Sequence, residues 1–95
     1  MPPAIGLLEI DLLIPGSGSL KDKRKVIRSI RDRVRSGFNV SFAEVGHREL
    51  RARSHLAFVT VCNDRKEAEK RLNAVGEMVL SLGGTEIVEQ VIQWL

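Results

Sequence analysis

The apolar residues of this chain switch repeatedly between two spacings, and the order of these switches restricts the fold more than any short motif does. Across residues 4–14 apolar and polar residues alternate, which predicts a strand with one buried face. From residue 19 to about residue 36 the apolar residues recur at helical spacing, and Gly37 is a typical helix stop. The core positions expected here are Leu8, Ile10, Leu12 and Ile14 in the strand and Leu20, Val26, Ile27, Ile30 and Val34 in the helix.

The second half of the chain repeats these two spacings. Residues 38–45 alternate again, and residues 53–62 are apolar on both faces, as expected of a central strand. A second helix is expected to open at residues 63–64 and to stop at residues 83–84, which are both glycine. Residues 85–95 favour a final strand.

The predicted order of elements is β, α, β, β, α, β, which corresponds to two split βαβ halves. We therefore expect an α+β protein with a ferredoxin-like βαββαβ sandwich, in which a four-stranded antiparallel sheet carries both helices on one face. A chain of 95 residues accommodates one such core, so residues 1–95 are expected to form a single domain. In this topology the loop 15–19, the hairpin loop 46–52 and the turn near residues 83–84 lie at the same end of the sheet.

The cysteine content and the N-terminal segment favour a cytoplasmic protein. Cys62 is the only cysteine, so the chain cannot form an internal disulfide and suits a reducing compartment. Residues 1–13 lack a basic start, and Glu9 and Asp11 interrupt their apolar run. We therefore expect neither a signal peptide nor a membrane span, and no membrane partner.

The first predicted helix is strongly basic. Residues 21–35 contain eight basic and two acidic residues, a net charge of +6 in a chain whose total is +3. Arginines at positions 24, 28, 31 and 35 follow each other at i+4, i+3 and i+4 and form one stripe beside the apolar stripe. Like charges at these spacings, and cations in the first turn, are unfavourable for a helix.

Two interpretations of this stripe remain open. It could be a solvated face, in which Asp32 pairs with Arg28 and the arginines reflect a general preference for this residue. It could also bind a polyanion such as RNA, and the basic loop GHRELRA at residues 46–52 favours this second interpretation. The predicted anion-binding residues are Lys21, Lys23, Arg24, Lys25, Arg28, Arg31 and Arg35, with Arg48 and Arg51 as auxiliaries. The acidic residues of the first strand argue against binding of bases on the sheet, the mode of RNA-recognition motifs.

No constellation in the sequence supports catalysis. The segment IPGSGS at residues 14–19 lacks the spacing of a Walker A motif and the third glycine of a dinucleotide fingerprint, and a turn followed by a helix cap at Ser19 explains it. Acylphosphatase has the same order of elements and a similar length, but its Q-G-V-x-F-R-like phosphate cradle is missing here. A phosphate-handling enzyme of that kind is therefore only a distant third hypothesis.

The histidines and the cysteine do not indicate a metal or a nucleophile either. His47 and His55 are not joined by cysteine or carboxylate residues at the spacing of a metal site. Cys62 is expected to be a small buried residue at the end of a strand. We expect no enzymatic activity, no cofactor and no metal.

The sheet face away from the helices is a candidate protein interface. If the even-numbered residues of the first strand are buried, then Ile5, Leu7 and Leu13 point to the opposite side. They would be joined by either Leu56 with Phe58 or Ala57 with Val59 from the third strand. An uncovered face with several aliphatic side chains favours a homodimer, although scattered surface aliphatics are also ordinary. The alternative function is thus a homodimeric interaction module without a nucleic-acid role.

Three segments resemble a known family. They are I-P-G-S-G-S-L-K-D-K-R-K-V at residues 14–26, F-N-V-S-F-A-E-V at residues 38–45 and V-C-N-D-R at residues 61–65, and they resemble the YlxP-like family of short bacterial proteins of unknown function. The resemblance implies a ferredoxin-like domain without an established activity, often encoded near translation-initiation and ribosome-maturation factors. The loop at residues 46–52 departs from the family pattern, which tends to be more acidic there. The resemblance therefore supports the fold and leaves the chemistry open, and it is the basic first helix that favours a binding protein associated with RNA or the ribosome.

Overall fold

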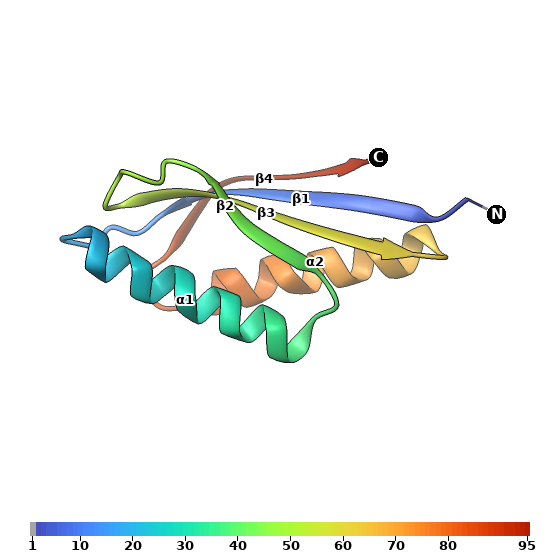
Figure 1. Ribbon diagram of the computed structural model, residues 1–95, viewed down its shortest axis with the longest axis horizontal. Coiled ribbons are helices and arrows are strands. Elements are labelled where there is room, and N and C mark those ends of the chain that lie inside the picture. Colours follow the sequence, from blue (N-terminus) through green and yellow to red (C-terminus); the bar gives the residue numbers. More distant parts are fainter. Residues whose placement is uncertain (1) are drawn as a thin grey trace.

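The computed structural model describes residues 2–95 and has the expected ferredoxin-like architecture (Figure 1). One four-stranded antiparallel sheet has the strand order β2-β3-β1-β4, and the two helices cover one of its faces (Figure 1). The elements are β1 (Ala4–Leu13), α1 (Leu20–Gly37), β2 (Ser41–Gly46), β3 (Arg53–Cys62), α2 (Arg65–Ser81) and β4 (Glu86–Trp94). The predicted fold class is confirmed.

The core lies between the central strands and the helices. In the register of β1 with β3, Leu8 stands opposite Phe58 and Ile10 stands opposite Leu56, and all four side chains are fully buried. The helix α2 packs on β1, β3 and β4 with a stripe of small and aliphatic residues. Its approach is close at Gly6, where an added Cβ atom would lie 2.7 Å from Cδ1 of Leu72. The buried residues of α2 are Ala68, Leu72, Val75, Gly76 and Val79.

The helix α1 lies at the β2 side of the sheet, beside α2 (Figure 1). The hydroxyl of Ser19 caps its start by accepting a hydrogen bond of 3.1 Å from the backbone N–H of Asp22. The loop before it is a turn, because the N–H of Ser17 donates to the carbonyl of Ile14 and its hydroxyl donates to the carbonyl of Ser19. The interpretation of this glycine- and serine-rich segment as a turn and a helix cap is confirmed.

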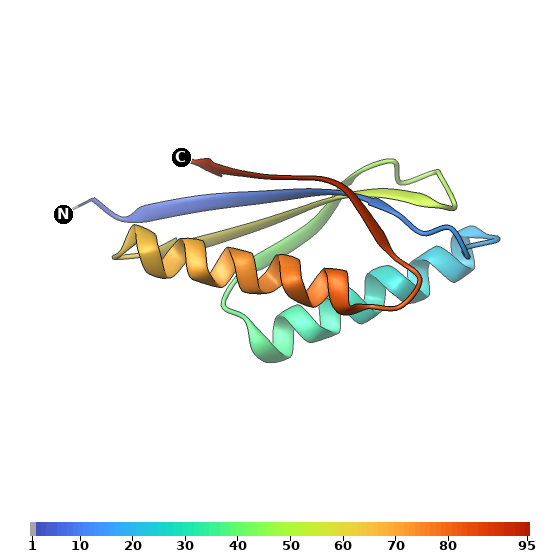
Figure 2. The same ribbon diagram turned by 180° about the vertical axis from the view of Figure 1, so that it is seen from behind.

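Three loops meet at one end of the molecule, as the topology predicts. Figure 2 shows the loop after β1, the β2–β3 hairpin loop and the turn after α2 at the same end. A backbone hydrogen bond of 2.8 Å from the N–H of Ile14 to the carbonyl of Ala52 joins the first two loops. Within the described part of the chain, neither helix has the length and the apolar character needed to cross a membrane.

Candidate functional site

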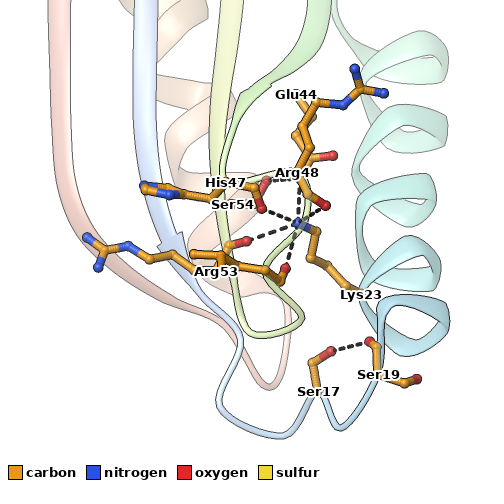
Figure 3. Close-up of polar contacts among 9 residues, drawn as sticks. Ser17, Ser19, Lys23, Glu44, His47, Arg48, Arg53 and Ser54 are labelled. Carbon is orange, nitrogen blue, oxygen red and sulfur yellow. Dashed lines mark hydrogen bonds and ion pairs between the residues drawn. The ribbon is translucent and has the colours of Figure 1, made fainter.

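Lys23 lies inside the molecule rather than on the basic surface. Its side chain is 2% exposed, and its Nζ atom is surrounded by five oxygen atoms (Figure 3). It donates hydrogen bonds to carbonyl oxygens of the β2–β3 hairpin and forms an ion pair of 2.9 Å with Oε2 of Glu44. The carbonyl oxygens belong to His47 at 2.7 Å, Arg48 at 3.2 Å, Leu50 at 2.8 Å and Arg53 at 3.0 Å.

This arrangement corrects the prediction that Lys23 contacts phosphate. A lysine has three N–H donors, and those of Lys23 are already directed at hairpin oxygens. Oε2 of Glu44 also accepts a hydrogen bond of 2.6 Å from the hydroxyl of the buried Ser54. Lys23 therefore fastens the hairpin to α1 and has no donor left for a ligand.

Helical periodicity contained a signal for this buried network. Lys23 is one helical turn before Ile27, so it falls on the apolar stripe of α1. Glu44 follows Phe42 at a spacing of two, which directs it to the helix-covered face of β2, and Ser54 precedes Leu56 in the same way. The sequence signal for this network is therefore the presence of Lys23, Glu44 and Ser54 at positions where the apolar spacing predicts inward-facing side chains.

The other eight predicted cations form what we call the basic surface. They are exposed, except for the half-buried Arg31. Within residues 2–95, none of them has an acidic partner within 4.0 Å or donates a side-chain hydrogen bond, and Arg28 does not pair with Asp32. The members are Lys21, Arg24, Lys25, Arg28, Arg31 and Arg35 of α1 with Arg48 and Arg51 of the hairpin loop.

The arginine stripe follows the flank of α1 that faces the edge strand β2. Arg31 and Arg35 line a cleft of about 280 Å³ together with residues 40–42 at the start of β2. On the opposite flank, Val26 lines a separate hollow with Leu82, which follows α2. The hairpin loop with Arg48 and Arg51 lies at the N-terminal end of the stripe, held there by Lys23 (Figure 3). The arginines of helix and loop thus offer their charges on one side of the molecule, whereas Lys25 lines the hollow on the opposite flank.

Arg53, the first residue of β3, is directed to a different face. Its guanidinium donates two hydrogen bonds to the carboxylate of Asp11, at 3.2 Å to Oδ1 and 2.7 Å to Oδ2, on the sheet face without helices. The hydrogen bonds from Arg53, together with its positive charge, lower the pKa of Asp11 below its ordinary value against the opposing effect of burial. Beside this pair, Nε2 of His55 lies 3.1 Å from Oε1 of Glu9.

The open face of the sheet is apolar at one end and charged at the other. Ile5 stands opposite Val61 and Leu7 opposite Val59, so the third strand contributes Ala57 and Val59, the second of the two predicted pairs. Val61 is 59% exposed and Val59 36%. Leu13 is separated from this cluster by the acidic residues 9 and 11 and stands opposite Arg53.

The remaining candidates for chemistry are dispersed. Cys62 is half-buried rather than buried. Across residues 2–95, no group of three or more histidine, cysteine, aspartate and glutamate residues is arranged to hold a metal ion. Arg65 lies over the ring of Trp94, with 4.5 Å between its Cζ atom and the ring centroid, a contact that no sequence motif indicated. This pair connects the start of α2 with the end of β4.

Comparison with known proteins places the chain in a family. Residues 5–92 match the family described as "Protein of unknown function (DUF503)". The chain belongs to this family. It is also 38% identical over 71 residues to the uncharacterized protein YlxP of Bacillus subtilis (strain 168), an alignment that covers 75% of this chain and 77% of that protein. The resemblance inferred from the three sequence segments is confirmed, and neither description names an activity or a ligand.

Proposed function

We propose that this member of the DUF503 family is a non-catalytic, cytoplasmic protein that binds RNA, free or within the ribosome, through its basic surface. The observation that carries the proposal is the absence, within residues 2–95, of acidic partners around all eight of these cations. Among the other cations of residues 2–95, Lys23 pairs with Glu44 and Arg53 with Asp11, and the unpaired ones of α2, such as Lys66 and Lys70, lie outside this stripe. A helix face that serves only solubility has no reason to gather unpaired like charges at i, i+4 spacing, which costs stability.

The chemistry of these groups fits phosphate. Guanidinium groups donate two parallel hydrogen bonds to a phosphate, and six of the eight members of the basic surface are arginine. Contacts of this kind position a nucleic acid without reading its sequence. The network around Lys23 keeps Arg48 and Arg51 in a fixed place relative to the stripe, so helix and hairpin loop can contact neighbouring phosphates of one RNA.

Charge reversal on the stripe tests the proposal. Mobility shifts with structured and single-stranded RNA are compared at about 50 and about 200 mM salt, and four or more phosphate contacts would lower the affinity about a hundredfold over this range. Arg24→Glu with Arg28→Glu should abolish the shift. The matched control is Lys66→Glu with Lys70→Glu, which changes the net charge equally, at the same spacing, on exposed positions of α2. The absence of binding at low salt, or an equal loss in the control, would refute the proposal.

A second candidate function is a homodimer formed through the open face of the sheet. The aliphatic cluster of Ile5, Leu7, Val59 and Val61 favours it, with Leu13 at the charged end as a peripheral contact. Sedimentation of the wild type beside Leu7→Arg tests this function, and Leu80→Arg on the exposed side of α2 is the control. A wild type that sediments as a monomer would exclude the dimer.

A further inference from the structure

The cleft between α1 and β2 is lined by apolar and aromatic residues as well as by arginines of the basic surface. Its walls are Arg31, Val34 and Arg35 from the helix, Val40 just before β2, and Ser41 and Phe42 from the strand, and its volume is about 280 Å³. Two arginines thus line the same hollow as a phenylalanine and two valines. A hollow of this size is near the lower end of small-molecule pockets, which hold about 300–1,000 Å³.

The position of Phe42 makes the cleft suited to a planar ligand. Phe42 is half-buried, and its ring stacks on the fully buried Phe58 with 5.0 Å between the centroids. Stacking on Phe58 holds one side of the ring in place, while Phe42 still lines the cleft. Aromatic rings held in this way are the platforms on which unpaired bases stack in proteins that bind single-stranded nucleic acids.

From these observations we infer that the cleft holds one unpaired nucleotide of a bound RNA, with its phosphate on Arg31 and Arg35 and its base against Phe42 and Val40. This inference rests on the proposed function and adds a preference for single-stranded RNA. A paired base cannot enter, because its edge is occupied by its partner and its faces by its neighbours in the stack. The arginines outside the cleft, such as Arg24 and Arg28, would contact the adjoining phosphates whether the RNA is paired or not.

An acidic peptide is the competing occupant, since β2 is an edge strand and could pair with an added strand. The irregularity of β2 argues against it. The strand has six residues, and its register with β3 shifts between Glu44 and Gly46. Only residues 41–44 keep a regular register with β3, which leaves a short edge for a further strand, and short edge strands disfavour such pairing. The observations therefore favour a nucleotide.

Fluorescence anisotropy with labelled RNA of one length, single-stranded or as a duplex, tests the inference at low salt. Phe42→Leu retains an apolar side chain but removes the stacking surface, and should weaken binding of the single strand about tenfold while leaving the duplex unchanged. Arg31→Gln with Arg35→Gln should weaken the single strand by a larger factor than the duplex. Lys66→Gln with Lys70→Gln, on exposed positions of α2 at the same spacing, is the control for loss of two charges.

The outcomes separate this inference from the proposed function. If the wild type binds both RNAs and the cleft variants weaken them equally, the cleft holds no unpaired base and the inference is overturned while the proposed function stands. If neither RNA binds, both fail. A labelled oligoglutamate peptide is the third probe, and tighter binding of this peptide than of RNA, lost with Arg31→Gln, would assign the cleft to a protein partner. Thermal melting identifies any loss of folding in Phe42→Leu, and the arginine variants then decide the inference alone.

Discussion

At the scale of single residues, the same residue type has different roles depending on the face to which it is directed. Lys23 and Lys25 are two positions apart in α1, yet the first is buried among hairpin oxygens and the second is exposed. Helical position decides the difference, because Lys23 falls on the apolar stripe of α1 and there meets the carboxylate of Glu44 inside the molecule. Buried charges occur where they are paired and hydrogen-bonded, and Lys23 satisfies both conditions.

Removing the buried ammonium should destabilise the protein strongly. Lys23→Met leaves the carboxylate of Glu44 without its partner and several hairpin carbonyls without a donor, so we expect a loss of about 3–5 kcal/mol in the free energy of unfolding. Lys25→Met, at an exposed position, should change it by less than about 0.5 kcal/mol. Urea denaturation measures both. The double variant Lys23→Met with Glu44→Leu should recover part of the loss, and equal effects of the two single variants would contradict the structural role.

The pair of Asp11 and Arg53 should make stability depend on pH in the acidic range. The pKa of Asp11 is lowered in the folded protein from its ordinary value of 3.8, so the pair contributes stability that is complete above this value. The contribution is lost as the pH falls through the lower pKa of the folded state. The wild type should therefore be more stable than Asp11→Asn at pH 7, and the difference in urea midpoint should shrink below about pH 4. A difference that is the same at both pH values would contradict this assignment.

At the scale of elements, the alternation of apolar spacing predicted all four strands and both helices, and the bounds of β3 agree at both ends with those predicted. The start of β2 was predicted three residues too early. Phe38 has extended backbone angles, but its N–H donates to the carbonyl of Val34 and completes the end of α1. Asn39 then accepts a hydrogen bond from the hydroxyl of Thr60. These residues alternate like a strand because they pack against the core, while their backbone serves the connection from helix to sheet.

The dipole of α1 allows a test of whether Lys21 lowers the stability of the helix while it contributes to RNA binding. Lys21 is in the first turn of α1, where the positive end of the helix dipole disfavours a cation. Lys21→Glu should raise the free energy of unfolding by about 0.3–1 kcal/mol and weaken RNA binding at the same time. Lys25→Glu makes the same change of charge beyond the first turn and should weaken binding without this gain in stability. Thermal melting and anisotropy on the same samples measure the two effects, and a Lys21→Glu protein with unchanged affinity would remove Lys21 from the basic surface.

At the scale of the whole molecule, topology explains which parts of the candidate site were predictable. The βαββαβ order places the hairpin loop beside the start of α1, so a common basic surface could be predicted from two segments more than ten residues apart. The cleft could not be predicted, because its walls depend on how far α1 lies from β2, a distance set by side-chain packing. The orientation of the Arg53 side chain toward Asp11 could not be predicted either, because it depends on the register between β1 and β3.

The two surfaces of the molecule would not compete for space. The basic surface follows α1 and the hairpin, whereas the aliphatic cluster lies on the face of the sheet without helices (Figure 1). A dimer formed through that face would hold two basic surfaces. A long RNA bound to one of them would be present at a high effective concentration near the other, so it would bind more tightly than a short RNA. Leu7→Arg should then weaken binding of an RNA of about 40 nucleotides by about tenfold or more and leave one of about 10 nucleotides unaffected. Because the substitution adds a positive charge, a loss of affinity for RNA cannot come from electrostatics. Equal affinities of Leu7→Arg and wild type for the long RNA would mean that the two surfaces act separately.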